Sequence, residues 1–105
     1  MNNDSIKIYK DKSLKEEILS TFHLGIVPAG ETRSFTFWVS NESNAYLKEL
    51  KFSVEHQEVE VTEAPTEMLS HTVEKLVLTW NPSITLKEGL EAQLKVSGIE
   101  LWGRI

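Results

Sequence analysis

The sequence predicts a single all-β domain, a sandwich of about seven antiparallel strands. Two observations support this prediction. Hydrophobic and polar residues alternate along six segments of the chain, which is the pattern of strands with one buried face. The breaks between these segments are rich in proline, glycine, asparagine and serine, the residues that turns use. Short strands separated by such turns are typical of antiparallel sandwiches and barrels.

The alternating segments define the expected strands in chain order. They cover residues 6–9, 35–40, 50–55, 58–62, 76–80 and 90–97. In each segment a hydrophobic residue recurs at every second position, as in Phe35, Phe37 and Val39. An edge strand is expected at about residues 20–24. Residues 98–102 alternate again, so they either extend the last strand past a glycine bulge or bend away as a separate ribbon.

Turn residues separate these strands. The turns are expected at residues 28–30, 41–44, 64–65, 81–83 and 87–89. Near the N-terminus, Ser13 and Glu16 have the spacing of a helix capping box, which predicts one short helical turn near residues 13–18. We therefore expect an N-terminal arm or edge strand over residues 1–15 and a single β-sandwich domain over residues 16–105.

The composition is that of an ordinary globular domain. Of the 105 residues, 40% are hydrophobic and 26% charged, which suits one folded domain and not a disordered chain. The chain has no cysteine, which excludes disulfides, zinc–thiolate sites and thiol catalysis. Its formal net charge of -5 repels phosphate backbones, so no nucleic-acid partner is expected.

The hydropathy of the chain bears on its location. Residues 1–5 are polar and no hydrophobic segment follows them, so no secretory signal is expected. The longest apolar runs are about three residues, whereas a membrane-spanning helix needs about 20. We therefore expect neither a transmembrane segment nor contact with a membrane.

No motif of catalysis occurs in the sequence. The nucleophile, phosphate-loop and zinc-protease motifs are absent, and His23, His56 and His71 each stand alone. We expect no catalytic residue, no cofactor, no metal site and no small-molecule substrate. One alternative is a small hydrolase or metalloenzyme, because His56 and Glu58 lie two residues apart and suit zinc or manganese. A solvated polar strand face is the favoured interpretation of this pair.

Two tryptophans are the candidate partner-binding residues. Trp38 lies on the strand face opposite Phe35 and Phe37, and Trp102 lies close to the C-terminus, where burial is difficult. Tryptophan is enriched at protein interfaces. The alternative, in which Trp38 covers an edge of the sandwich and Trp102 packs on the bottom of the core, stays open at this point.

Two stretches of the chain resemble a known family. Residues 23–32 followed by 35–41 have its glycine-containing turn, its alternating strand and its asparagine-containing turn, and residues 78–83 and 89–98 are similar to its later strands. The family comprises immunoglobulin-like domains of the ASPM-SPD-2-Hydin and major-sperm-protein kind, and similar accessory domains occur in phage virions. The resemblance covers about residues 20–98. It implies an immunoglobulin-like sandwich that serves in adhesion, scaffolding or assembly and has no catalytic residues.

These observations favour a non-enzymatic structural or interaction domain. The expected partner is a protein or a second copy of the chain, within a larger assembly. By the resemblance, this assembly is a phage virion, with the domain in the head, neck or tail. The location is then the virion, and otherwise the cytoplasm. The alternative function is a carbohydrate-binding module, which requires at least two of Trp38, Trp80 and Trp102 to be exposed on one surface.

Overall fold

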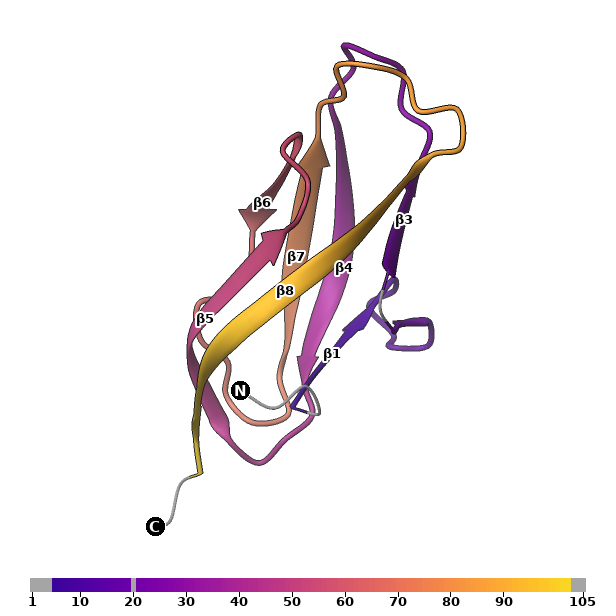
Figure 1. Cartoon of the computed structure of the whole chain (residues 1–105). Helices are drawn as coiled ribbons and strands as arrows, with labels where there is room; N and C mark the ends of the chain where they lie inside the picture. The colour runs from indigo at the N-terminus through magenta and orange to yellow at the C-terminus, as the bar shows by residue number, and fades with distance from the viewer. Residues whose placement is uncertain (1–4, 20, 103–105) are drawn as a thin grey trace.

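The computed structural model describes residues 5–19 and 21–102. Over this part the chain forms eight β-strands and no helix, which confirms the all-β prediction (Figure 1). The strands are β1 (Ile6–Tyr9), β2 (Glu17–Ile18), β3 (Thr21–Gly25), β4 (Arg33–Asn41), β5 (Tyr46–Val54), β6 (Val59–Glu63), β7 (Val73–Trp80) and β8 (Leu90–Leu101). The same residues contain no helix long and apolar enough to cross a membrane.

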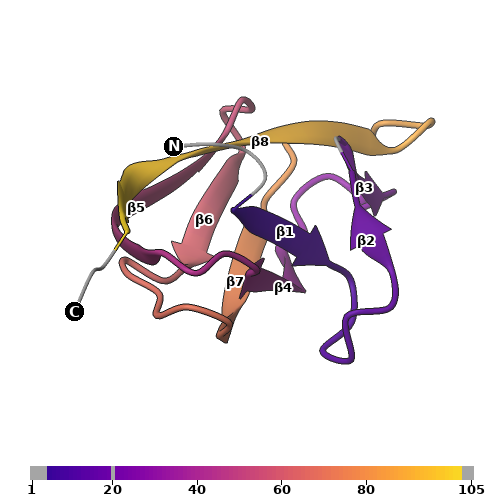
Figure 2. The same ribbon diagram turned by 90° about the horizontal axis from the view of Figure 1, so that it is seen from below.

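The strands form two antiparallel sheets that face one another as a sandwich. The strand order is β2-β1-β4-β7-β6 in the five-stranded sheet and β3-β8-β5 in the three-stranded sheet. Seen along its length in Figure 2, the molecule has β8 in one layer and β1, β4 and β7 in the other. The chain passes between the sheets at five connections, namely β2 to β3, β3 to β4, β4 to β5, β5 to β6, and β7 to β8.

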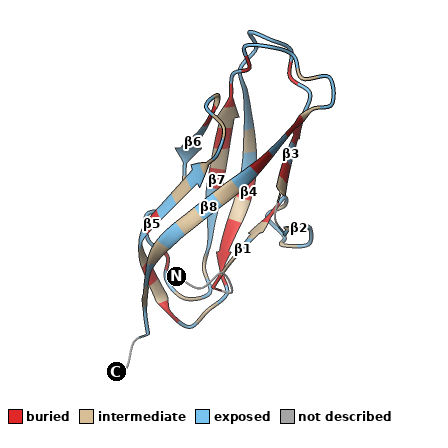
Figure 3. Cartoon of the chain, in the orientation of Figure 1, coloured by how far each residue is buried: buried red, intermediate tan, exposed pale blue. Residues whose placement is uncertain are grey.

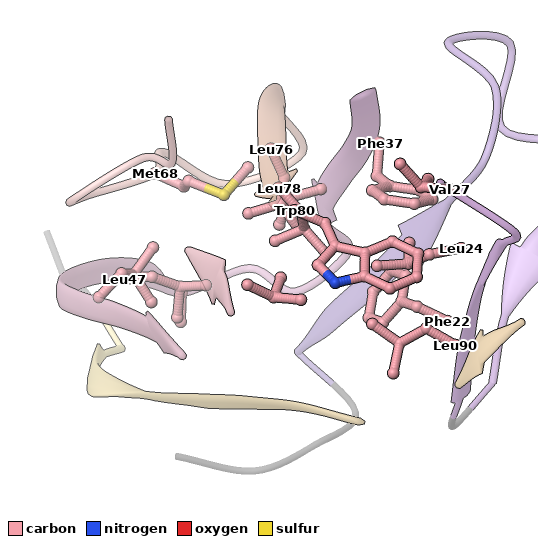
Figure 4. Packing of buried hydrophobic residues seen from close by; sticks show 14 residues of the cluster. Phe22, Leu24, Val27, Phe37, Leu47, Met68, Leu76, Leu78, Trp80 and Leu90 are labelled. Carbon is pink, nitrogen blue, oxygen red and sulfur yellow. The ribbon is translucent and has the colours of Figure 1, made fainter. Parts of the chain in front are cut away.

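The core lies between the sheets, and buried residues alternate with more exposed ones along parts of the long strands, as at Leu76, Leu78 and Trp80 of β7 (Figure 3). Phe22 of β3 and Phe37 of β4 meet across the layers in an edge-to-face arrangement, with ring centroids 4.7 Å apart. Trp80 has no exposed surface and lies among them (Figure 4). The buried cluster consists of Phe22, Leu24, Val27, Phe37, Val39, Ala45, Leu47, Leu50, Val59, Met68, Leu76, Leu78, Trp80 and Leu90. Each large side chain contributes about 1.5–3 kcal/mol when fully buried.

Residues 13–18 do not form the predicted helical turn. Instead, the Asp11 carboxylate accepts hydrogen bonds from the hydroxyl of Ser13 and from the backbone N–H groups of Lys15 and Glu16, the last two at 3.0 and 2.8 Å. These bonds, led by that of Ser13, lower the pKa of Asp11. Because Asp11 holds the hydroxyl of Ser13, this serine does not cap a helix, and the chain turns back as the hairpin of β1 and β2.

β1 lies between β2 and β4 in the five-stranded sheet. Ile8 is opposite Ile18 of β2 on one side and Val39 of β4 on the other. The short β2 brings the number of strands to eight, where about seven were predicted. A strand of two residues has too few positions to show alternation, which explains why the sequence pattern did not reveal it.

The last strand continues through Gly98 as far as Leu101, so residues 98–101 extend β8, as in one of the two alternatives predicted, and Trp102 follows the strand. The bulge lies on the neighbouring strand β5, where the backbone of Glu49 has a φ of 53°. Gly98 fits opposite this bulge, because a Cβ atom at that position would lie 2.7 Å from Cδ2 of Leu50. The irregularity is therefore shared between the two strands, the bulge on β5 and the missing side chain on β8.

Candidate interaction surfaces

Trp38, one of the two predicted partner-binding residues, is half-buried on the outer face of the five-stranded sheet. Its cross-strand neighbours are Tyr9 of β1 and Lys75 of β7. The Nζ atom of Lys12 lies 5.4 Å from the centroid of the Trp38 ring, within the range of a cation–π interaction. The β1–β2 turn thus covers part of this indole and leaves only part of its surface for a partner.

Tyr9, beside Trp38, belongs to a fixed polar network. Its hydroxyl donates a hydrogen bond of 2.9 Å to the Glu42 carboxylate, which also lies 3.7 Å from Nζ of Lys7. Burial of the ring, with the nearby charge of Glu42, raises the pKa of Tyr9 to about 12. The surroundings of Trp38 are therefore organised by contacts within the domain.

Trp102, the second predicted residue, is 60% exposed. Its Nε1 atom donates a hydrogen bond of 3.2 Å to the Glu100 carboxylate. The same carboxylate accepts a 2.6 Å hydrogen bond from the hydroxyl of Ser5, close to the start of β1. Glu100 therefore ties the end of β8 to the N-terminal strand and holds the indole of Trp102 at the lower end of the sandwich, where β8 ends in Figure 1.

Exposed apolar side chains of two adjacent strands lie at the end of β8, where Trp102 follows in the chain. Ile99 and Leu101 of β8 are 43% and 42% exposed, and Leu101 is opposite Tyr46 of β5. Because Leu47 of β5 points into the core, its neighbour Tyr46 and the paired Leu101 point to the outer face of the sheet. We name Tyr46, Ile99, Leu101 and Trp102 the C-terminal patch.

The positions of the hydrophobic residues along the last strand indicate that Ile99 and Leu101 are exposed. Hydrophobic residues occupy even positions from Leu90 to Val96, and then odd positions at Ile99 and Leu101. Because β8 runs through Gly98 without a register shift of its own, this change of parity moves the side chains from the core to the outer face. Sequence reasoning singled out Trp102 and missed these neighbours.

One positive charge belongs to the C-terminal patch. Lys48 of β5 is opposite Ile99 and shares its outer face. No ion pair of Lys48 is found within residues 5–19 and 21–102. The patch thus combines apolar area with an available cation, on a chain whose formal net charge is -5.

The three histidines lie apart, and each has a local partner. Nδ1 of His23 lies 3.5 Å from the Glu91 carboxylate, and Nε2 of His71 lies 2.8 Å from Oδ1 of Asn44. Nδ1 of His56 accepts a hydrogen bond of 3.2 Å from the backbone N–H of Glu58. In the described part of the chain, no three histidine or carboxylate side chains gather as metal ligands would.

The Glu58 carboxylate holds the loop between β7 and β8. It accepts hydrogen bonds from the hydroxyl of Ser83 and, at 3.0 Å, from the backbone N–H of the same residue. These bonds, first that of the hydroxyl, lower the pKa of Glu58, with smaller contributions from His56 and Trp80. A carboxylate with a lowered pKa is a weak base, so this contact fits a loop anchor better than an activated serine.

The three indoles do not share a surface. Trp80 is fully buried, and its Nε1–H makes no hydrogen bond within the described residues, although it lies near enough to Glu58 to stabilise that charge weakly. Trp38 lies on the five-stranded sheet, and Trp102 follows the end of β8 in the three-stranded sheet. The aromatic platform that a carbohydrate-binding module requires is therefore not formed by these residues.

Comparison with protein-family models, with curated proteins and with solved structures found no match to this chain.

Proposed function

We propose that this domain is a non-enzymatic interaction module whose C-terminal patch binds another protein within a larger assembly. The observation that supports this proposal is the exposure of Ile99 and Leu101 beside Tyr46 on two paired strands, with the exposed Trp102 directly after the end of β8. Exposed apolar patches mark sites of interaction on soluble proteins, and tryptophan and tyrosine are enriched at interfaces. A few aromatic anchors of this kind supply much of the binding energy of a typical interface.

The patch is organised before any partner binds. Tyr46 and Leu101 are a register pair of β5 and β8, and the hydroxyl of Tyr46 donates a hydrogen bond of 2.7 Å to the Glu67 carboxylate. The indole of Trp102 is held by Glu100. Side chains that are already ordered lose less conformational entropy on binding, which favours affinity.

The charge of the patch specifies the chemistry of the partner. Lys48 lies among apolar side chains and is available for an ion pair. A protein surface with apolar residues and a carboxylate would complement the patch. The assembly that we propose is a phage virion, and this step rests on the resemblance of residues 23–32, 35–41, 78–83 and 89–98 to immunoglobulin-like domains.

The test compares capture of partners by matched variants. The triple variant Ile99→Ser, Leu101→Ser, Trp102→Ser removes the apolar area of the patch. The control variant Ile26→Ser, Ile84→Ser removes two exposed side chains from the loops at the opposite end of the sandwich (Figure 1). Each protein is immobilised and exposed to a lysate of the source cells, and light scattering gives its own mass in solution.

We expect the wild type and the control variant to retain the same partner, and the triple variant to lose it. Equal retention by the triple variant would show that the patch is not the binding surface. A wild type that stays monomeric and retains no partner would contradict the interaction function itself. Circular dichroism of all three proteins confirms that the comparison is between folded domains.

A further inference from the structure

The edge of β5 differs from the other three edges of the two sheets. β2 has two residues, and β6 contains a register shift and is followed by Pro65. β3 has a register shift before Gly25, whose φ is 71°. Short strands, bulges and prolines are the features that keep sheet edges from pairing with other chains. β5 has none of them between Lys51 and Val54, where its register with β8 is regular.

Only part of the β5 edge is covered by its own chain. Leu47 exchanges backbone hydrogen bonds with Met68, and the N–H of Leu50 donates to the carbonyl oxygen of Thr66. Beyond Leu50, the strand order leaves this side of β5 without a neighbouring strand among the described residues. The open window therefore begins at Lys51.

Alternation along the strand identifies the free backbone groups. The N–H of Glu55 points to β8, where it donates to Gln93, so the odd residues of this stretch face β8 and the even residues face outward. The outward residues are Phe52 and Val54. Of their backbone groups, the carbonyl oxygen of Val54 accepts from the N–H of His56. The other three groups have no strand opposite them within the described part of the fold.

The sequence of this window is complementary to itself. If two copies pair antiparallel about a two-fold axis at Ser53, Lys51 of each copy is opposite Glu55 of the other, and Phe52 is opposite Val54. Opposite charges and apolar pairs at facing positions stabilise antiparallel strands. Phe52 and Val54 then form the hydrogen-bonded pairs. The N–H of Val54 donates to the carbonyl oxygen of Phe52 in the second copy, and the N–H of Phe52 donates to the second lone pair of the Val54 carbonyl oxygen, which also accepts from His56 in its own chain.

The charges at this edge fit such a pairing. Lys51 has no ion-pair partner within residues 5–19 and 21–102, whereas Glu55 forms an ion pair with Lys95 on the same outer face. In the paired state, each Glu55 carboxylate would lie between Lys95 of its own chain and Lys51 of the second copy. Phe52 and Val54 are half-buried in one chain, and pairing would cover more of their apolar surface.

We propose that two copies of this chain associate through residues 51–54 of β5 and the adjoining Glu55, which joins their three-stranded sheets into one sheet of six strands. The pairing is isologous, since the same segment serves on both sides. It deepens the proposed function and rests on it, because it names a second copy as one partner of the domain. It uses a surface that does not include the C-terminal patch.

The experiment is a charge exchange followed by analytical ultracentrifugation over a range of concentrations. The wild type is expected to show a species of twice the 12.0 kDa chain mass. The variant Lys51→Glu places two carboxylates opposite each other at this pair, and the variant Glu55→Lys places two ammonium groups there. Each variant is expected to self-associate at least about tenfold more weakly than the wild type, because like charges directly opposite repel.

Mixing the two variants is the decisive step. The outcome of mixing depends on which positions face each other across the two-fold axis. In the mixed dimer, position 51 of the Lys51→Glu chain is opposite the new lysine of the Glu55→Lys chain, and Glu55 of the first chain is opposite Lys51 of the second. Both facing pairs therefore carry opposite charges, and a mixed dimer of near wild-type affinity is expected.

Lys87→Glu is the matched control for the charge exchange. This exposed lysine lies in the loop between β7 and β8, outside residues 51–55 and outside the C-terminal patch, so its substitution is expected to leave self-association unchanged. Thermal unfolding of each protein separates a loss of pairing from a loss of folding.

A wild type that stays monomeric at every concentration would overturn the pairing. So would a dimer that Lys51→Glu and Lys87→Glu weaken equally, or two variants that do not associate when mixed. These results would not contradict the proposed interaction function if the C-terminal patch still binds a partner. Conversely, loss of that partner with an intact dimer would contradict the role of the patch and not the pairing of β5.

Discussion

The side-chain amide of Asn41 donates a hydrogen bond of 3.0 Å to the backbone carbonyl oxygen of Leu69, and so joins the end of β4 to the segment before β7. Asn41 has no exposed surface. The same amide donates at 2.9 Å to the carbonyl oxygen of Ala45, while its Oδ1 atom accepts from the backbone N–H of Ser43 at 3.1 Å. One side chain thus replaces the backbone pairing that the irregular chain lacks at this end of the sandwich.

We predict that Asn41→Ala destabilises the domain by about 1–3 kcal/mol, because it leaves buried backbone groups without partners. The measurement is urea unfolding followed by circular dichroism. Asn44→Ala is the control at an exposed asparagine of the same turn, and it is expected to change the free energy of unfolding by no more than about 0.5 kcal/mol. Equal losses in the free energy of unfolding for the two substitutions would show that the buried hydrogen bonds of Asn41 do not stabilise the domain more than those of an exposed asparagine.

The pairing of Phe22 with Phe37 predicts a large cost for loss of either ring. We expect Phe37→Ala to reduce the free energy of unfolding by about 3–5 kcal/mol, since it removes a buried aromatic side chain and leaves a cavity between the sheets. Thr36→Ala, on the exposed face of the same strand, serves as the control. A loss below about 1 kcal/mol in Phe37→Ala would mean that the two layers repack freely.

Two glycines with positive φ allow the cost of a backbone contact to be measured. Gly89 and Gly30 have φ values of 82° and 84°, but a Cβ atom on Gly89 would lie 3.0 Å from the carbonyl oxygen of Gly25, whereas one on Gly30 would meet open space. Alanine at either position is expected to cost about 1–2 kcal/mol for the left-handed backbone. We predict that Gly89→Ala is the more destabilising of the two in thermal unfolding, and equal losses would contradict this.

The lowered pKa of Glu58 predicts a dependence of stability on pH. Because the folded state favours the charged carboxylate, the stabilising effect is present above the ordinary carboxyl pKa of about 4.3 and is lost as the pH falls through the lower value of the folded state. Glu58→Gln should therefore lower the melting temperature at neutral pH, and the difference from the wild type should shrink in acid. Glu60→Gln, which removes an exposed carboxylate of β6, is the control for the change of net charge.

The sequence was most informative where one physical rule governs a long segment. Alternation places Phe37 and Leu78 in the core and predicts the strands that contain them, since one face of each sheet is buried. The local pattern was less informative near Ser13, because a serine followed by a glutamate three residues later suits both a helix cap and a loop that a nearby carboxylate organises. Asp11 decides between the two, and its contacts depend on the folded hairpin.

The candidate surfaces could be predicted only in part for a similar reason. The exposure of Trp102 follows from its place near the end of the chain, but that of Leu101 depends on which face of β8 it occupies. The open window of β5 depends on where Thr66 returns to the sheet. Neither is encoded in a short stretch of sequence, because each is set by the register between distant strands.

The separate surroundings of the three indoles give the chain built-in optical probes. An indole in a dry, apolar interior emits at shorter wavelength than one in water, so Trp80 should supply the blue part of the emission and Trp102 the red part. Unfolding would shift the first, and a protein seated at the end of β8 would shift and shield the second. A single fluorescence spectrum can therefore report on the integrity of the sandwich and on the occupancy of its lower end at the same time.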